Sequence, residues 1–234
     1  AIWDDHDFGL NDGGRDYLFK EEAKKMFLNF WNVAEDDPRN YREGVYFKNI
    51  KNVDGTKIEI IALDTRFFRS KLNGKKNEYK PNINPQATIL GKEQWDWFQS
   101  SITNSTSKVI IILSSIQVLA TDHPYEKWAN FPLERSKLIK ILSEATKDKT
   151  VIVVSGDRHR SGIYQNDFFI EITASSLNRP GPKFKESDPL LIGETFPEMN
   201  YGILNIQPLQ NKIILSLHDK KGEKLNSKII NFFQ

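Results

Sequence analysis

The chain has 234 residues, with 33 Lys and Arg against 31 Asp and Glu, four His and no Cys. Its formal net charge of +2 gives no global electrostatic reason to expect a nucleic acid or an anionic membrane as partner. Because Cys is absent, this sequence excludes disulfides, zinc fingers and thiolate nucleophiles. Any metal must therefore be held by carboxylate, imidazole, amide or backbone groups, which favours hard or borderline cations.

The chain starts with an apolar stretch that is followed directly by an acidic segment. Neither an initiator Met nor a signal segment precedes this stretch in the sequence. The longest apolar runs, such as residues 109–113, are far shorter than the roughly 18 residues that a membrane span needs. We therefore expect no transmembrane segment, and we expect a chain that begins inside a domain.

The first part of the chain combines a helical pattern with two strand patterns. Residues 21–31 place apolar side chains at helical spacing, with acidic residues ahead of lysines as the helix dipole prefers, and predict a helix. Residues 46–50 and 57–63 flank an Asp-Gly pair at 54–55, which suits a tight turn, so they predict two antiparallel strands. Residues 67–87 are rich in Lys, Asn, Gly and Pro and predict an exposed loop.

The middle of the chain has the pattern of a parallel βαβ unit. Residues 92–102 predict a helix, and residues 109–113 and 150–154 are continuous β-branched runs, typical of strands covered on both faces. Residues 132–144 lie between these runs and carry an apolar stripe. Because a strand, a helix and a strand follow one another, we expect some parallel sheet.

The last third predicts short strands joined by Asn, Asp and Gly turns, which is the pattern of an antiparallel sheet. Residues 177–199 carry four of the ten prolines and predict an irregular surface loop. No segment resembles a linker, so we expect one domain over residues 1–234, of mixed α/β class. The strands expected in this third are 163–164, 168–173, 201–206, 213–218 and 229–233.

Acidic side chains cluster at the start of the chain, where four carboxylates and one imidazole fall within nine residues. They cannot all be buried without compensation, because desolvating each charge is costly, and a bound cation would supply that compensation. A solvated acidic loop that caps the helix predicted at 21–31 is the alternative. The five side chains are Asp4, Asp5, His6, Asp7 and Asp12.

A second group of titratable residues follows the strand predicted at 150–154. A glycine there permits a sharp turn, after which Asp157 and His159 stand two positions apart and point to one side in extended geometry. These two side chains can share a cation, whereas Arg158 and Arg160 point elsewhere and could meet phosphate oxygens. The alternative is an Asp-Arg ion pair that ends the strand, beside a histidine that is only hydrogen-bonded.

Four motifs occur in an informative order, although any one of them alone would be weak. They are Ile-Trp-Asp-Asp-His-Asp-Phe-Gly at 2–9, Leu-Asp-Thr-Arg at 63–66 with Phe-Arg-Ser at 68–70, Leu-Gly-Lys-Glu-Gln-Trp-Asp-Trp-Phe at 90–98, and Ser-Gly-Asp-Arg-His at 155–159. Taken together, the motifs resemble the PhoD-like alkaline phosphatase and phosphodiesterase family, a branch of the calcineurin-like metallophosphatases.

The resemblance implies a four-layer αββα sandwich with mixed sheets and two metal ions at the strand ends. It further implies that a metal-activated hydroxide hydrolyses phosphate monoesters or diesters. By similarity, Asp5, Asp157 and His159 are metal ligands, and His6 assists catalysis at the leaving oxygen. The implied metals are Fe and Ca, and Zn or Mn also suits such ligands.

The resemblance also points to residues that would meet the phosphate ester. Arg158 and Arg160 are candidates. Arg66 ends a strand with Asp64, and we expect these two residues to form a structural ion pair, although Arg66 could reach a phosphate. The family usually carries a further His after a central strand, and residues 114–117 of this chain contain none. Gln117 or a water could fill that place.

The front of the family pattern is absent from this sequence. The family carries, ahead of Trp-Asp-Asp-His, a turn with a Cys or Asp ligand and a Gly-Asp turn with a bridging Asp, and Gly-Asp occurs here only at 156–157. We therefore expect roughly the C-terminal two thirds of a catalytic domain that lacks its first strands. The alternative to a phosphate ester hydrolase is a non-catalytic piece that needs a complementary N-terminal chain. Because the family is commonly exported, we expect a periplasmic, surface or extracellular location.

Overall fold

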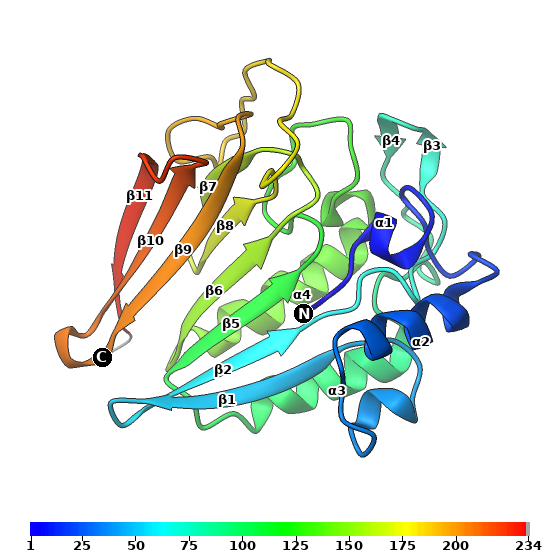
Figure 1. The fold of residues 1–234 in the computed structure, drawn as a ribbon, viewed down its shortest axis with the longest axis horizontal. Helices are drawn as coiled ribbons and strands as arrows, with labels where there is room; N and C mark the ends of the chain where they lie inside the picture. The colour runs from blue at the N-terminus through cyan, green and yellow to red at the C-terminus, as the bar shows by residue number, and fades with distance from the viewer. Residues whose placement is uncertain (233–234) are drawn as a thin grey trace.

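Two β-sheets packed face to face form the centre of the computed structural model, which describes residues 1–232 (Figure 1). The helices are α1 (Asp5–Phe8), α2 (Lys20–Phe30), α3 (Gly91–Thr103) and α4 (Pro132–Ala145), with 3₁₀ turns at Pro38–Asn40, Trp128–Asn130 and Pro208–Gln210. The strands are β1 (Phe47–Val53), β2 (Thr56–Ala62), β3 (Asn73–Lys75), β4 (Glu78–Lys80), β5 (Val109–Ser114), β6 (Thr150–Ser155), β7 (Ser161–Gln165), β8 (Ile170–Ala174), β9 (Asn200–Gln207), β10 (Lys212–Asp219) and β11 (Lys224–Asn231).

The larger sheet has six strands in the order β1-β2-β5-β6-β8-β7. Its four central strands run parallel, and an antiparallel strand flanks them on each side. Since all four central strands end at the same edge of the sheet, the loops that follow them meet there. This edge is where open α/β sheets bind their ligands.

The central strands are apolar along their whole length because both faces of the larger sheet are covered. In β5, Ile110 and Ile112 face α3 and α4 and contact the cluster that contains Leu138. Val109 and Ile111 face the opposite way and join the cluster that contains Leu215 of β10. Because successive side chains of a strand point to opposite faces, the apolar run of β5 contributes to a hydrophobic cluster on each face of the sheet.

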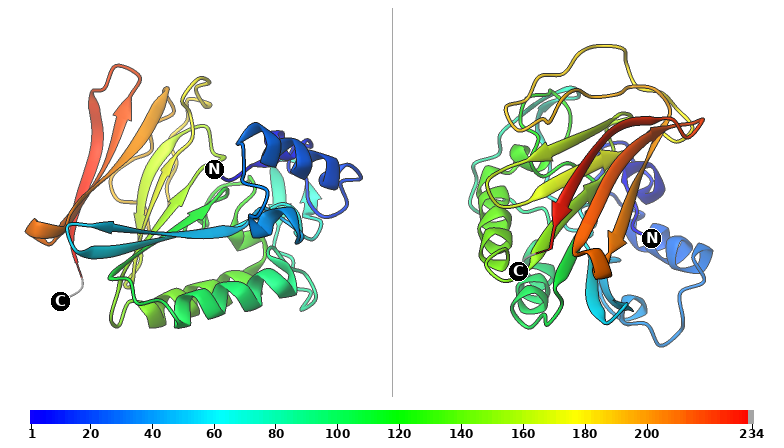
Figure 2. Two further views of the ribbon diagram at one scale, coloured as in Figure 1. Left: turned by 60° about the horizontal axis from the view of Figure 1, so that its bottom comes forward. Right: turned by 90° about the vertical axis from the view of Figure 1, so that its left-hand side faces the viewer.

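The smaller sheet has the order β11-β10-β9, with antiparallel pairing throughout. Ile213, Leu215 and Leu217 of β10 are fully buried against the larger sheet. Within residues 1–232 no helix covers the outer face of the smaller sheet, so three layers are present where we expected four (Figure 2). The physical reason is that α3 and α4 both belong to right-handed crossovers between neighbouring parallel strands, which place them on one face.

The predicted helices and most predicted strands are confirmed, including the hairpin turn, where Asp54 and Gly55 adopt φ of 47° and 79°. The parallel βαβ unit is confirmed by the pairing of β5 with β6. In the last third the prediction was wrong for β8, which pairs in parallel with β6, although the remaining pairs are antiparallel. Phe233, which we included in the last strand, lies outside the described residues.

Residues 67–87 are more ordered than an exposed loop. They contain the β3–β4 hairpin, and Phe67 and Arg69 near their start are buried. The hairpin sequence lacks the alternation of apolar and polar residues by which strands are predicted. The hairpin is held in place by Tyr79, whose hydroxyl donates a hydrogen bond of 2.7 Å to Asp12. In the part of the chain that is described, no helix combines the length and apolarity needed to cross a bilayer.

Candidate functional site

A cleft of about 530 Å³ opens at the carboxyl edge of the larger sheet. The first residues of the chain, the turn after β6, the segment after β8 and the β3–β4 hairpin all contribute to it. Its lining includes the predicted residues Asp5, His6, Asp157, Arg158 and His159, and it also includes Asp4, Asp7, Asn11, Asp12, Lys76, Asn77, Tyr125, Ser175, Arg179 and Pro182.

A buried carboxylate at the end of β2 holds the start of the chain against this edge. Asp64 accepts hydrogen bonds from the indole Nε1 of Trp3 and from the backbone N–H groups of Val45, Arg66 and Phe67, at 2.9–3.0 Å. Burial raises the pKa of Asp64, and these donors oppose the rise. The acidic segment that follows Trp3 is thereby fixed beside the cleft.

Arg66 lies behind the cleft and is fully buried. Its guanidinium pairs with Asp4, with an Nε to Oδ1 distance of 2.9 Å, and with Glu126, which also pairs with Arg69 at 2.8 Å. The expected ion pair between Asp64 and the Arg66 side chain does not form, because that carboxylate is occupied by N–H donors. Nor does Arg66 belong to the cleft lining, so its side chain orients Asp4 rather than facing a substrate.

The turn after β6 presents Asp157 in a strained conformation. The N–H of Arg158 donates to the carbonyl of Gly156 over 2.8 Å, which makes Asp157 the central residue of a three-residue turn with φ of 67°. His159 also has a positive φ, of 50°. Left-handed non-glycine residues are costly and concentrate at functional sites. The two side chains therefore do not follow the extended geometry that we assumed from the sequence.

Three carboxylates converge in the cleft. One oxygen of each of Asp4, Asp5 and Asp157 lies within 4.8 Å of the others. Asp5 is held by the N–H of His6 at 2.7 Å and by the N–H of Asp12 at 3.0 Å. Burial, and then the negative charge of Asp4, raise the pKa of Asp157 well above its usual value. A cation at this carboxylate cluster would relieve both effects.

The sequence placed Asp4 among the clustered carboxylates but did not assign it as a metal ligand, because the motif singled out Asp5 alone. Its place beside Asp5 in the acidic segment was a signal, but only the pairing of its side chain with Arg66 fixes where the carboxylate points. His159 lines the same cleft but is not one of the residues whose ligand atoms lie within 4.8 Å of one another.

The two histidines of the cleft differ in their surroundings. The side chain of His6 is 77% exposed, and its Nε2 lies 4.0 Å from Oδ2 of Asp5. Desolvation and the neighbouring charge of Arg179 lower the pKa of His159, which favours the neutral imidazole that a metal ligand must be.

Arg158 and Arg160 are committed to internal partners. Both pair with the buried Glu186, Arg160 at 3.4 Å, and the guanidinium of Arg158 lies 4.4 Å from the ring centre of Tyr125. Their side chains are only 4% and 1% exposed. The structure brings Arg158 to the cleft wall, whereas Arg160 is not part of the lining and donates to the carbonyls of Pro182 and Phe184.

Gln117 is also buried and lies outside the cleft lining. Its amide nitrogen donates to Thr173 over 2.9 Å, and its oxygen lies 3.1 Å from Nε2 of His123. Gln117 is therefore bound to internal partners and is not open to the cleft.

The cleft as a whole is acidic. Its lining carries the carboxylates of Asp4, Asp5, Asp7, Asp12 and Asp157 against the three cations Lys76, Arg158 and Arg179. A phosphate group would be repelled by such a surface unless bound cations reversed its charge. All the donors at the carboxylate cluster are hard oxygens, which suit Ca, Mn or Fe, and the neighbouring imidazole extends the choice to Zn.

Several known proteins resemble this chain. Alkaline phosphatase D of Bacillus subtilis (strain 168) is 25% identical over 127 residues, which cover 50% of this chain and 22% of that protein. Among solved structures, one described as the structure of PhoD has a TM-score of 0.70 at 17% identity, over 97% of this chain and 54% of its own. The chain therefore spans about half the length of that protein, and less of the curated relative.

Two further structures share the fold. Purple acid phosphatase PPD1 from yellow lupin (Lupinus luteus) has a TM-score of 0.60 at 13% identity, over 98% of this chain and 40% of its own. GAP50, the anchor in the inner membrane complex of Plasmodium, has a TM-score of 0.59 at 14% identity, over 81% and 55%. The predicted mixed α/β fold of a metallophosphatase is confirmed by these likenesses. Since a sequence profile described as PhoD-like phosphatase also matches residues 1–202, the chain belongs to the PhoD-like phosphatase family.

Proposed function

We propose that this protein hydrolyses phosphate esters with the help of metal ions held in the cleft. The observation that carries the proposal is the convergence of Asp4, Asp5 and Asp157, whose oxygens lie within 4.8 Å of one another in a cleft rich in carboxylates. Burying like charges this closely is costly unless a cation is bound between them. The family to which the chain belongs supports phosphate esters as the substrates.

Five residues of the cleft have proposed roles. Asp5, Asp157 and His159 hold the metals, and Asp4 joins them through its place in the carboxylate cluster. Bound cations would supply an acidified water as nucleophile and would offset charge on the phosphate oxygens. His6 stands exposed at the cleft and protonates the leaving oxygen. Fe with Ca is the proposed metal pair, with Zn or Mn as the other candidates.

Release of nitrophenol tests the proposal. The protein should hydrolyse p-nitrophenyl phosphate, its bis-ester or both when Ca, Fe, Mn or Zn is added, and the ratio of the two rates gives the preference for monoesters or diesters. Asp5→Ala and His159→Ala should abolish the activity, whereas Asp54→Ala, in the distant hairpin turn, should leave it unchanged. Activity that survives Asp5→Ala and His159→Ala would refute these roles.

A second candidate function is that of a half-site which binds metal but needs a complementary N-terminal chain for activity. The number of ligands favours the half-site. Within residues 1–232 the carboxylate cluster offers three carboxylates, and a pair of cations usually needs more ligands than that. Metal analysis together with the mass of the purified species decides between the candidates. Two metals per active single chain would exclude the half-site.

We also propose that residues 1–234 act as one domain and that the protein is exported, as the family resemblance suggests. Limited proteolysis tests the first proposal, since a single domain should yield no stable internal fragments. Fractionation of the source cells tests the second, and recovery in the cytoplasm alone would contradict it.

A further inference from the structure

One arginine of the cleft has no internal partner. Arg179 lines the cleft and is exposed, whereas Arg158 and Arg160 are buried against Glu186. Within residues 1–232 no carboxylate lies within ion-pair distance of the Arg179 guanidinium, which also donates no hydrogen bond and lies over no aromatic ring. Its charge is therefore available to something that enters the cleft.

The backbone on both sides of Arg179 is fixed although its side chain is free. Ser176 donates its hydroxyl to the carbonyl of Arg179, and the N–H of Gly181 donates to the carbonyl of Pro197 over 2.8 Å. Gly181 also lies so close to His159 that a Cβ at this position would be 2.1 Å from the histidine carbonyl oxygen. A charged group on an anchored segment loses little freedom when it binds a ligand.

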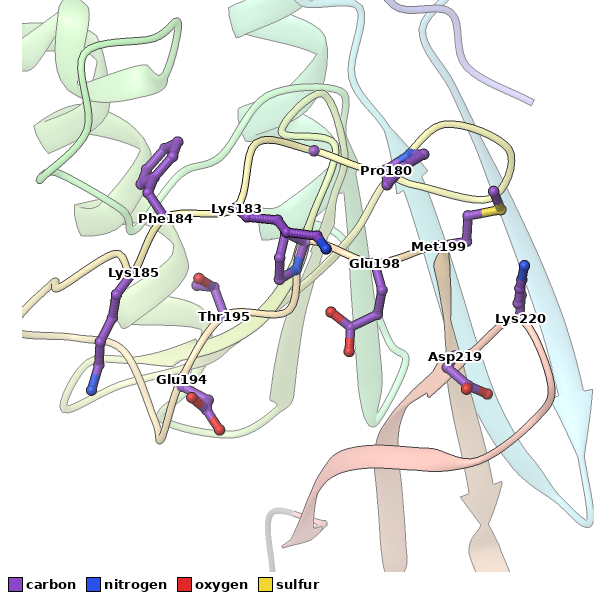
Figure 3. A pocket seen from close by; sticks show the side chains of 12 residues that line it. Pro180, Lys183, Phe184, Lys185, Glu194, Thr195, Glu198, Met199, Asp219 and Lys220 are labelled. Atoms are coloured by element: carbon purple, nitrogen blue, oxygen red, sulfur yellow. The ribbon is translucent and has the colours of Figure 1, made fainter.

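The segment that carries Arg179 separates two hollows. On one side, Arg179 and Pro182 line the cleft with the carboxylate cluster. On the other, Pro180 and Lys183 line a cavity of about 660 Å³ together with side chains from the turn between β10 and β11 (Figure 3). Two cations four positions apart in one loop thus face different spaces, and only Arg179 shares a space with the candidate metal ligands.

We propose that Arg179 binds the non-bridging oxygens of the phosphate group that the cleft accepts. A guanidinium offers two parallel N–H donors that match two phosphate oxygens, a geometry that an ammonium cannot supply. This inference rests on the proposed function, because it takes a phosphate as the ligand of the cleft. It moves the phosphate-binding role from Arg158, Arg160 and Arg66, which the structure pairs internally, to an arginine outside the four motifs.

Calorimetric binding of inorganic phosphate to the Mn-loaded protein tests the inference without relying on turnover. Arg179→Ala should raise the dissociation constant at least about tenfold, as loss of a charge-assisted hydrogen bond implies. Arg179→Lys should fall between this variant and the unaltered protein, because it keeps the charge and loses the paired donors. Lys183→Ala is the matched control from the same loop and should bind phosphate normally. The KM for p-nitrophenyl phosphate should follow the same order.

The possible results separate this inference from the proposed function. An active protein whose phosphate affinity and KM are unchanged by Arg179→Ala would overturn the inference and leave the function standing. A protein that is inactive with every metal, but binds phosphate through Arg179, would overturn the function alone. Absence of phosphate binding in the unaltered protein would overturn the inference, and inactivity in addition would overturn both.

Discussion

The indole Nε1 of Trp3 donates a hydrogen bond of 2.9 Å to Oδ1 of Asp64, which lies 61 positions later in the chain. Both side chains are buried, and the same carboxylate receives three backbone N–H groups at the end of β2. The bond fixes the segment that carries Asp4 and Asp5 to the edge of the larger sheet. It therefore couples the stability of the fold to the position of the candidate metal ligands.

Replacing Trp3 should test this coupling. Trp3→Phe keeps most of the aromatic packing but removes a donor from a buried carboxylate, so the free energy of unfolding should fall by about 1–3 kcal/mol. Urea denaturation followed by circular dichroism measures the change. Trp31→Phe, at an exposed tryptophan, is the control and should have little effect. Equal losses in both variants would show that the hydrogen bond to Asp64 contributes nothing.

The carboxylate of Glu126 balances the positive charge of two buried arginines behind the cleft. This carboxylate is fully buried and lies 2.5 Å from Arg66 and 2.8 Å from Arg69. Glu126→Gln leaves the buried Arg69 without its paired carboxylate and leaves Arg66 with Asp4 alone. Breaking such a buried pair costs about 3–5 kcal/mol of unfolding free energy. Glu144→Gln breaks an exposed pair with Lys147 and should change stability little. Similar stabilities of the two variants, measured by urea denaturation, would contradict this account.

The regular elements could be predicted because their signals are local. The alternation in β5 and the apolar stripe of α4 follow from burial on defined faces, and both were found where the pattern put them. The β3–β4 hairpin could not be found in this way, since Tyr79 is tied to Asp12, 67 positions earlier. The missing fourth layer was an expectation carried by resemblance, and among residues 1–232 no helix lies over the outer face of the smaller sheet.

The candidate site was predictable in its acidic residues but not in its cationic ones. Clustered carboxylates are visible in sequence as a local excess of charge, which is why Asp5 was singled out. Asp157 was singled out because it follows a glycine at the end of a predicted strand. The role of an arginine, by contrast, can be assigned only when it is known whether its guanidinium is paired inside the protein. Arg158 meets Glu186 across 28 positions, while Arg179 in a Pro-rich loop meets no carboxylate among the described residues. Sequence alone cannot tell a paired arginine from a free one.

Removing charge from the carboxylate cluster should have opposite effects on the metal-free and metal-bound protein. In Asp157→Asn the half-buried charge and its repulsion by Asp4 are gone, so the melting temperature without metal should rise. The same change removes a ligand, so the further rise in melting temperature on adding Ca or Mn should shrink. Differential scanning calorimetry in chelator and in metal measures both effects.

Asp54→Asn provides the control for Asp157→Asn because it removes a carboxylate from the exposed hairpin turn. It should alter neither the stability in chelator nor the increment that metal produces. A metal-induced increment that stays full in Asp157→Asn would contradict the assignment of this residue as a ligand.

Lys127 should make stability depend on pH in the alkaline range. Burial, and then the charge of Arg158, lower its pKa to about 8, while the unfolded chain keeps the ordinary value near 10.5. Between these values the unfolded state binds more protons, so the penalty present below about pH 8 is relieved as the pH rises towards about 10.5. The unfolding free energy of the protein relative to Lys127→Met should therefore increase over this range. A constant difference across the range, in urea denaturation, would contradict the lowered pKa.

Gly181→Ala should weaken phosphate binding without touching any charged group. A Cβ there would lie 2.1 Å from the carbonyl oxygen of His159, so the loop has to move away and take Arg179 with it. The dissociation constant for phosphate, measured by calorimetry, should rise towards that of Arg179→Ala. Gly202→Ala is the control. Gly202 lies on β9 outside the cleft lining, and its Cβ would approach only side-chain carbons, the nearest at 3.3 Å. If Gly181→Ala bound phosphate as tightly as Gly202→Ala, the position of the loop would not set the affinity.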